Sequence, residues 1–197
     1  MQLGLQMRGE QSPASIGVSI LRSIVPYVEA KVAVVYALEG DALVRLAAWA
    51  LPDEDSAPRS IARGEGLVGQ AVADARVLVL RDASAHYLKT GFALGSAAAT
   101  RVVTRVVIAP VFADGEVAGT IELGFVGGEG RFDDARALLE MASEPVGLAL
   151  RSAHYRARLV ELLEETQRQS EKLQVQQEEL RVSKEELEER GRALQDS

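Results

Sequence analysis

The sequence predicts an α+β fold, in which an antiparallel sheet with flanking helices is followed by a long helical extension. Two stretches rich in β-branched residues, 31–51 and 101–126, each break at a short polar turn, as β-hairpins do. Apolar residues recur at helical spacing in 13–28, and 132–153 also reads as a helix. Hairpins pair neighbouring strands in opposite directions. We therefore expect an antiparallel sheet with the two end helices on one face.

Composition divides the chain into three parts. Residues 1–11 have no apolar pattern and are expected to be a flexible N-terminus. Residues 12–151 have a mixed, glycine-rich composition, as in a globular domain. Residues 152–197 are instead rich in Glu, Gln, Leu and Arg. We therefore predict one folded domain followed by a coiled-coil helix.

Charge and residue counts exclude several classes of function. The chain has 197 residues, 47% of them hydrophobic, and a net charge of −7, which argues against a general affinity for nucleic acid or for anionic membranes. It contains no cysteine, which excludes disulfides, cysteine-ligated metals and thiol catalysis. The N-terminus does not resemble a secretory signal, and no apolar run approaches the roughly 20 residues of a membrane helix. We expect a cytoplasmic protein.

The first helix is expected to begin at Ser12, an N-cap residue with Pro13 in the first turn. Its apolar stripe consists of Ile16, Ile20, Ile24 and Val28. The first hairpin follows, with strands in 31–38 and 42–51 and a turn at Glu39–Asp41. A loop rich in Pro and Asp extends over 51–60.

The sequence GEGLVG at residues 64–69 has two interpretations. It fits the G-x-G-x-x-G pattern of dinucleotide-binding proteins, and Asp82 follows at a suitable distance. That fingerprint needs a parallel βαβ unit, whereas the neighbouring segments read as hairpins. The alternative, which we favour, is a tight glycine turn that opens a short helix over 64–75. A short strand at 76–80 and a long, partly helical connection over 81–100 come next.

The second hairpin is predicted by two apolar strands, 101–112 and 116–126, around the turn Ala113–Gly115. Arg101 and Arg105 are spaced to share one face of the first strand, either as anion ligands in a pocket or as ordinary surface charges. The last helix of the domain starts near Phe132 with acidic residues in its first turn, which suits the helix dipole. Pro145 should kink or weaken it, because proline donates no backbone hydrogen bond.

The C-terminal part has the heptad pattern of a coiled coil over about five repeats. The d positions and one a position form the expected dimer seam: Leu159, Leu163, Thr166, Leu173, Leu180, Leu187 and Leu194. The other a positions are mostly polar, which lowers stability but favours a defined register and a parallel two-stranded coil. The alternative is a solvated single helix held by pairs such as Glu164–Arg168 and Glu186–Arg190.

Candidate site residues lie in the long connection, because binding residues concentrate on loops that a rigid sheet carries. His86, beside Tyr87 and near Phe92, is one candidate for a pocket, and Arg101 is another. The second histidine, His154, falls on a helix and reads as a surface residue. Two histidines so placed make a metal site improbable, and no cofactor and no catalytic residue are expected.

Three segments together resemble a GAF domain: 64–82, 106–125 and 132–153. The tail and the stretch 86–99 resemble the corresponding region of bacterial hybrid sensor histidine kinases. The resemblance implies a central antiparallel sheet of five or six strands, end helices on one face and a ligand pocket under loops on the other. It also implies a dimeric sensory module of a two-component system that relays a signal through a parallel coil.

The departures from this family pattern restrict the expected chemistry. RFDDARALLE at 131–140 does not complete the cyclic-nucleotide signature, and the cysteines of bilin-binding and methionine sulfoxide reductase members are absent. No kinase phospho-acceptor motif or ATP-binding lobe is present in this chain. The expectation is a non-catalytic homodimer with an unknown small-molecule ligand, or alternatively a scaffold that binds no ligand.

Overall fold

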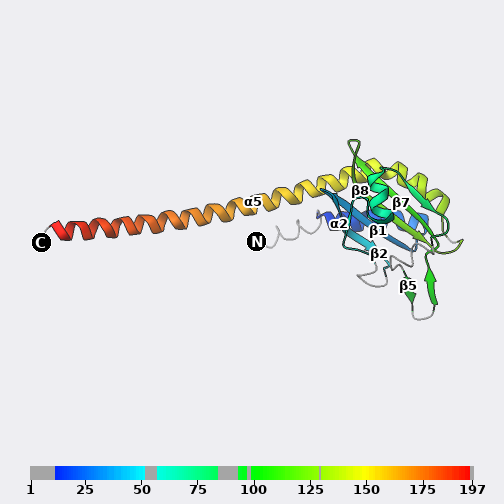
Figure 1. Ribbon diagram of the computed structural model, residues 1–197, viewed down its shortest axis with the longest axis horizontal. Coiled ribbons are helices and arrows are strands. Elements are labelled where there is room, and N and C mark those ends of the chain that lie inside the picture. Colours follow the sequence, from blue (N-terminus) through cyan, green and yellow to red (C-terminus); the bar gives the residue numbers. More distant parts are fainter. Residues whose placement is uncertain (1–11, 52–56, 84–92, 97–98, 129, 196–197) are drawn as a thin grey trace. The chain divides into compact units, whose positions relative to one another are not determined.

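The computed structural model describes residues 12–51, 57–83, 93–96, 99–128 and 130–195. It separates into two compact units, Met1–Tyr155 and Arg156–Ser197. The first unit is built on a six-stranded sheet in the order β3-β2-β1-β8-β7-β4, and all of its strand pairs are antiparallel (Figure 1). The predicted α+β class and the antiparallel sheet are confirmed.

Helix α2 (Pro13–Val28) begins as predicted, because the Ser12 side chain accepts a hydrogen bond from the backbone amide of Ser15 at 3.1 Å. The buried stripe is shifted from the predicted one. Leu21 and Val25 are buried beside Ile24 and Val28, whereas Ile16 and Ile20 are only partly buried. The helix ends at Glu29, whose φ of 58° is left-handed.

The two hairpins form where their turn residues predict them. Strands β1 (Val32–Glu39) and β2 (Ala42–Trp49) are joined at Gly40, and β7 (Arg105–Ala113) and β8 (Glu116–Phe125) at Asp114–Gly115. Asp114 and Gly115 both have positive φ, 50° and 80°, as a type I′ turn requires. Strands β1 and β8 pair with each other, so the two hairpins form the centre of the sheet.

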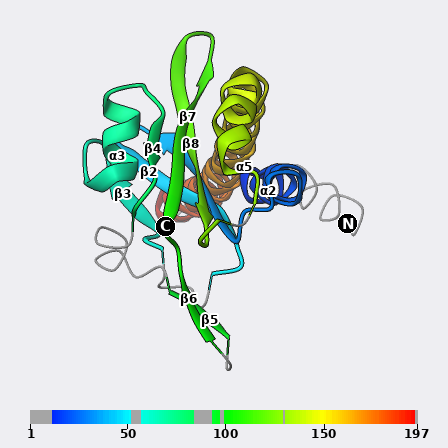
Figure 2. The ribbon, with the colours of Figure 1, turned by 90° about the vertical axis from the view of Figure 1, so that its right-hand side faces the viewer.

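The two faces of this sheet are covered by different helices (Figure 2). Helices α2 and α5 (Phe132–Gln195) pack on one face against Val35, Ile121 and Leu123. Helix α3 (Gly66–Ala73) packs on the other, which we call the α3 face, against Val34, Tyr36 and Ile108. The prediction that the end helices share one face is confirmed.

Three short strands were not predicted. β3 (Ser60–Ala62) pairs with β2 at one edge of the sheet, directly after the loop expected over 51–60. β5 (Ala93–Ser96) and β6 (Ala99–Val102) form a separate two-stranded sheet, where a partly helical connection was expected. The predicted short strand is present as β4 (Leu78–Leu80) at the other edge.

The glycine segment 64–69 forms the tight turn that we favoured. Gly64 and Gly66 have positive φ values of 86° and 60°, and α3 starts at Gly66. A Cβ on Gly69 would lie 2.4 Å from the carbonyl oxygen of Ala62, so only glycine allows α3 to lie this close to β3. The preceding strand β3 is antiparallel to its neighbour, which does not match the parallel unit of a dinucleotide site.

Helix α5 packs closely against the C-terminal end of β7 and is hydrogen-bonded to it. A Cβ on Gly147 would lie 1.9 Å from the carbonyl oxygen of Phe112. The Ser143 hydroxyl accepts from the Phe112 amide and donates to the Pro110 carbonyl, both at 3.3 Å. These contacts fall where β7 has an irregular register between Val111 and Phe112. The helix does not end at Pro145.

The second unit contains the rest of helix α5 and is charged on its outer positions. Arg181 bonds Glu178 and Glu185 at 2.7 Å, one turn before and one turn after it. Arg168 pairs with Glu165 at 3.2 Å and donates to the backbone carbonyl of Glu164 at 3.3 Å. Such pairs support an isolated helix by only a few tenths of a kcal/mol each, about 0.2–0.5 kcal/mol.

Candidate functional site

The α3 face of the sheet is the first candidate for a binding site. Its surroundings are apolar and mostly small: Val68, Ala71 and Val72 come from α3, and Ala57, Ala83 and Val103 from connecting segments. Apolar surroundings of this kind lower the local dielectric constant. Hydrogen bonds made there are stronger than in water, and a polar group left unpaired there is costly. Tyr36, Thr120 and Glu122 are the buried polar side chains of this face that the structure describes.

Tyr36 is completely buried, on β1. Its hydroxyl donates to the carbonyl oxygen of Pro58 at 3.3 Å, and Arg45 donates to the neighbouring carbonyl of Ala57 at 2.6 Å. Burial raises the pKa of the Tyr36 phenol well above its ordinary value. The negative charge of Glu122 adds to this increase, and Arg45 opposes it. Tyr36 is therefore a neutral hydrogen-bond donor that fixes the segment at Pro58.

Glu122 is only 5% exposed, although it lies in the middle of the central strand β8. It is opposite Val34 on β1 and Ile108 on β7, so its side chain shares the α3 face with Tyr36. Thr120, its neighbour on the same face, donates its hydroxyl to the Ala109 carbonyl at 3.0 Å. Carboxylates are almost never fully buried unless they are paired, and Glu122 does take part in an interaction within the fold. Its burial beside Tyr36 places two polar groups on this otherwise apolar face.

The residues predicted as pocket candidates are only partly placed by the structure. His86, Tyr87 and Phe92 lie outside the described residues. Arg101 lies in β6, and the structure does not describe its side chain. The expectation that Arg101 and Arg105 share a face of one strand was wrong, because the chain leaves β6 at Val102 and starts β7 at Arg105. The guanidinium of Arg105 instead lies 4.7 Å from the ring centroid of Phe132.

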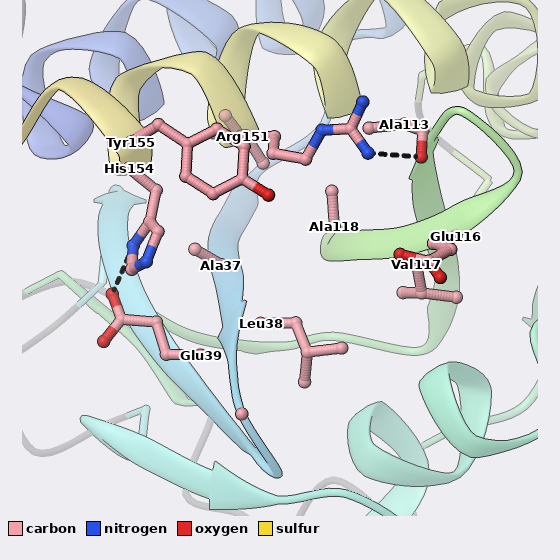
Figure 3. A pocket seen from close by; sticks show the side chains of 12 residues that line it. Ala37, Leu38, Glu39, Ala113, Glu116, Val117, Ala118, Arg151, His154 and Tyr155 are labelled. Carbon is pink, nitrogen blue, oxygen red and sulfur yellow. Dashed lines mark hydrogen bonds and ion pairs between the residues drawn. The ribbon is translucent and has the colours of Figure 1, made fainter. Parts of the chain in front are cut away.

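A cleft of about 200 Å³ lies between the tips of both hairpins and helix α5 (Figure 3). Ala37, Ala118 and Leu150 form part of its apolar lining, and Glu39, Glu116, Arg151, His154 and Tyr155 supply polar groups. Of the polar groups that line the cleft, only His154 was singled out from the sequence, as a surface residue of a helix. Segments more than a hundred residues apart meet here, and no local motif indicates such a meeting.

Arg151 connects helix α5 to the second hairpin. It donates to the carbonyl oxygen of Ala113 at 2.9 Å and contacts the carboxylate of Asp114. Glu144 accepts from the Asp114 amide at 2.9 Å, so two turns of the helix hold the same hairpin. Figure 3 shows the Arg151 side chain directed toward the Ala113 carbonyl along one wall of the cleft. Arg151 is therefore engaged within the fold.

His154 connects helix α5 to the first hairpin. Its Nδ1 lies 3.6 Å from Glu39 Oε1, and both side chains are about 40% exposed, 41% and 40% (Figure 3). The predicted surface position of His154 is correct. An exposed pair at this separation contributes at most about 1 kcal/mol, so this part of α5 is held mainly by Arg151 and by packing.

The predicted coiled-coil seam is exposed in the single chain. Leu159, Leu163, Leu173 and Leu180 are 60%, 64%, 59% and 70% exposed. Thr166 donates its hydroxyl to the Leu162 carbonyl of the preceding turn at 2.8 Å. Leu187 and Leu194 lie in α5, but the structure does not describe their side chains.

Among the residues that the structure describes, no group of three or more His, Cys, Asp or Glu side chains is placed to bind a metal ion. Within the same residues, no helix is both long enough and apolar enough to cross a membrane.

The family model described as "GAF domain" matches residues 10–151. The chain belongs to the GAF domain family. GAF domains are in general sensory or regulatory modules, and many of them dimerise and bind small ligands. The match ends four residues before the end of the first unit, so the second unit lies outside the family model. No curated protein matches the chain.

Solved GAF structures have the same fold at low sequence identity. The GAF domain from Acinetobacter phosphoenolpyruvate-protein phosphotransferase has a TM-score of 0.58 and 18% identity, covering 73% of this chain and 85% of that one. The GAF-B domain of DevS from Mycobacterium smegmatis gives 0.56 and 15%, covering 75% and 99%. Free methionine-R-sulfoxide reductase from Neisseria meningitidis, solved with its substrate, gives 0.54 and 20%, covering 75% and 83%.

These similarities establish the fold and leave the activity open. GAF structures include both regulatory domains and a reductase. The identities are too low to transfer a ligand or a reaction. What this GAF domain does must therefore be argued from its own residues.

Proposed function

We propose that this chain is a non-catalytic sensory GAF module that forms a homodimer through a parallel coiled coil. The coil and the end helices of the domain hold the two copies together. A small molecule bound on the α3 face changes the conformation of the domain, and the coil passes that change to an output element such as a histidine kinase. Two-component signalling in a bacterial cytoplasm is the setting that this arrangement fits.

The exposed leucines of the second unit carry this proposal. Leu159, Leu163, Leu173 and Leu180 are each at least 59% exposed and follow heptad spacing. Burying a leucine side chain gains about 1.5–3 kcal/mol, far more than the pairs on the outer side of this helix supply. A partner helix with the same spacing buries all of them at once, and a second copy provides that helix.

The ligand part of the proposal rests on the α3 face. Tyr36 and Glu122 place a phenol oxygen, whose proton is donated to Pro58, and a carboxylate in surroundings that are otherwise apolar. Ligand sites typically combine an apolar lining with a few polar groups that fix orientation. His86, Tyr87, Phe92 and Arg101 remain our candidates for further ligand contacts.

Native mass spectrometry of the full chain at low and high micromolar concentration tests the dimer. We expect a mass of twice 21.2 kDa, with any additional mass identifying a retained ligand. A monomer at all concentrations would overturn the proposed coil.

A thermal-shift screen of small molecules against the full chain and Glu122→Gln tests the ligand site. We expect a compound that raises the melting temperature of the native chain but has little effect on Glu122→Gln.

A dimerisation scaffold without a ligand is the second candidate. It is favoured by the way the domain fills its own α3 face, where Tyr36 already bonds Pro58 and small side chains pack around it. This candidate predicts a dimer of unchanged mass and no stabilising compound in the screen. A stabilising compound whose effect depends on Glu122 would exclude it.

We do not assign a reaction to the chain. Free methionine-R-sulfoxide reductases share its fold, but it has no cysteine for thiol chemistry. An assay for reduction of free methionine sulfoxide with the purified chain is expected to show no turnover, and measurable turnover would refute the non-catalytic assignment.

A further inference from the structure

Leucines of the second unit form a row along the helix, and a further row of residues lies on each side of it. The leucine row is made up of Leu159, Thr166, Leu173 and Leu180, seven residues apart. Three residues after each member comes the plus-three row: Leu162, Gln169, Gln176 and Ser183. Four residues after each member comes the plus-four row: Leu163, Ser170, Gln177 and Lys184. In every repeat the two flanking residues are adjacent in sequence, and in the first three repeats they are similar in polarity.

A two-stranded parallel coil needs two rows in its seam, one at a and one at d positions. If the leucine row takes the d positions, the plus-four row takes the a positions, which is the register predicted from the heptad pattern. If the leucine row takes the a positions, the plus-three row takes the d positions. The two registers differ by a modest rotation of each helix about its own axis, and both bury the leucine row.

The described side chains give no strong preference between these registers. Leu162 and Leu163 are both exposed, at 48% and 64%, so either can enter the seam. The middle repeats offer neutral polar residues on both sides, Gln169 against Ser170 and Gln176 against Gln177. One repeat differs, because the plus-four row carries the charged Lys184 where the plus-three row carries Ser183. The charged pairs of Arg181 with Glu178 and Glu185 form within one chain and are compatible with both registers.

We propose that the second copy of the chain packs against the leucine row in two alternative registers, one using the plus-three row and one using the plus-four row. This inference rests on the proposed parallel homodimer. It specifies how the coil holds two states: the leucines keep the dimer together while the flanking rows exchange. A small bias from the domain is then enough to change which row is buried, since nearly equal states shift with little free energy.

Disulfide cross-linking of the full chain tests the two registers, and the absence of native cysteines gives a clean background. Four single variants are compared under mild oxidation: Leu173→Cys in the shared row, Gln176→Cys, Gln177→Cys, and Glu178→Cys on the outer side. We expect similar initial rates for Gln176→Cys and Gln177→Cys, both about tenfold or more above Glu178→Cys. A difference of about tenfold or more between Gln176→Cys and Gln177→Cys would show a single register and overturn the inference.

The Leu173→Cys variant separates this inference from the proposed function. It cross-links in either register, so a cross-linked Leu173→Cys establishes the parallel dimer whatever the other rates are. A Leu173→Cys chain that does not cross-link overturns the parallel dimer, and the two registers with it.

A second pair of variants tests whether the registers exchange. Gln177→Ile makes the plus-four row more apolar, and Gln176→Ile does the same for the plus-three row. Reporters one repeat away, Ser170→Cys and Gln169→Cys, are then combined with each. We expect the ratio of cross-linking at 170 to that at 169 to rise about fivefold or more with Gln177→Ile and to fall by a similar factor with Gln176→Ile. Ratios that do not move in opposite directions would overturn the inference.

Discussion

The two units of this chain use the same residue types in opposite ways. In the first unit the large apolar side chains are buried: Leu21, Leu139 and Leu150 are at most 1% exposed. In the second unit Leu163, Leu173 and Leu180 are more than half exposed, although they recur as regularly as any core residue. The first unit therefore contains its own core, whereas the leucines of the second unit are exposed in the single chain and, in our proposal, are buried against a second copy. Substitutions in the first should change unfolding, and those in the second should change association.

The largest effect is expected at Leu139, which is fully buried where α5 packs on the sheet. Leu139→Ala should lower the free energy of unfolding of the first unit by about 2–5 kcal/mol, through lost burial and the cavity left behind. Met141, two residues away on the same helix, is 78% exposed, and Met141→Ala should change stability by less than about 0.5 kcal/mol. Urea denaturation followed by circular dichroism compares the two. Equal losses would mean that this helix is not packed as described.

Gly147→Ala should give the next largest effect. The added methyl group would lie 1.9 Å from the Phe112 carbonyl oxygen, so α5 or β7 must move. We expect a loss of about 1–3 kcal/mol in the first unit, despite the higher helix propensity of alanine. Gly128→Ala is the control, since a Cβ there meets no atom within 4 Å. A Gly147→Ala chain as stable as the native one would contradict the close packing of α5 on β7.

Leu173 and Val175 form a matched pair within the second unit, because both side chains are 59% exposed in the single chain. Leu173 lies in the leucine row, and Val175 lies on the outer side of the expected coil. Leu173→Ala should raise the dimer dissociation constant about tenfold or more, whereas Val175→Ala should leave it within about threefold. Sedimentation equilibrium gives both constants, and the urea midpoint of the first unit should stay the same in both variants. An equal effect of the two substitutions would rule out the proposed seam.

Tyr36 gives a smaller and pH-dependent effect, confined to the first unit. Its pKa is raised in the folded state, so above about pH 10 the unfolded chain loses the phenol proton while the folded chain keeps it. Stability from this group is complete below the ordinary tyrosine pKa and falls as the pH rises above it. We expect the native chain to lose about 1.4 kcal/mol per pH unit more than Tyr36→Phe in this alkaline range. Urea titrations at pH 9, 10 and 11 measure the difference, and parallel curves would contradict the assigned burial.

Local patterns predicted the parts of the fold that local chemistry determines. Ser12 caps α2 as expected, and Asp114–Gly115 forms the second hairpin turn. The glycines at 64 and 66 form a turn because their positive φ values suit no other residue as well. In each case the deciding interaction joins residues fewer than five positions apart, so the sequence already contains it.

The missed features depend on distant partners. The three residues of β3 are too few for a periodic pattern, and their strand character comes from pairing with β2. Glu122 does have a signal in the sequence, since it is a lone carboxylate between apolar residues in the middle of an apolar strand. Arg151 and Glu39 had none, because the cleft that they line forms only when α5 meets both hairpin tips. The coiled-coil seam stays a prediction from heptad spacing.

The seven-residue recurrence of the leucines also limits how this chain can be recombined with others. A grafted effector that begins with its own heptad pattern must be joined in phase, and linkers that differ by whole multiples of seven residues preserve that phase. Shortening or lengthening the junction by a single residue turns the effector by about a quarter of a circle relative to the leucines, since successive helical residues are about 100° apart. Junction length is therefore a design variable in its own right, and a ladder of one-residue insertions would show how strongly any attached effector depends on helical phase.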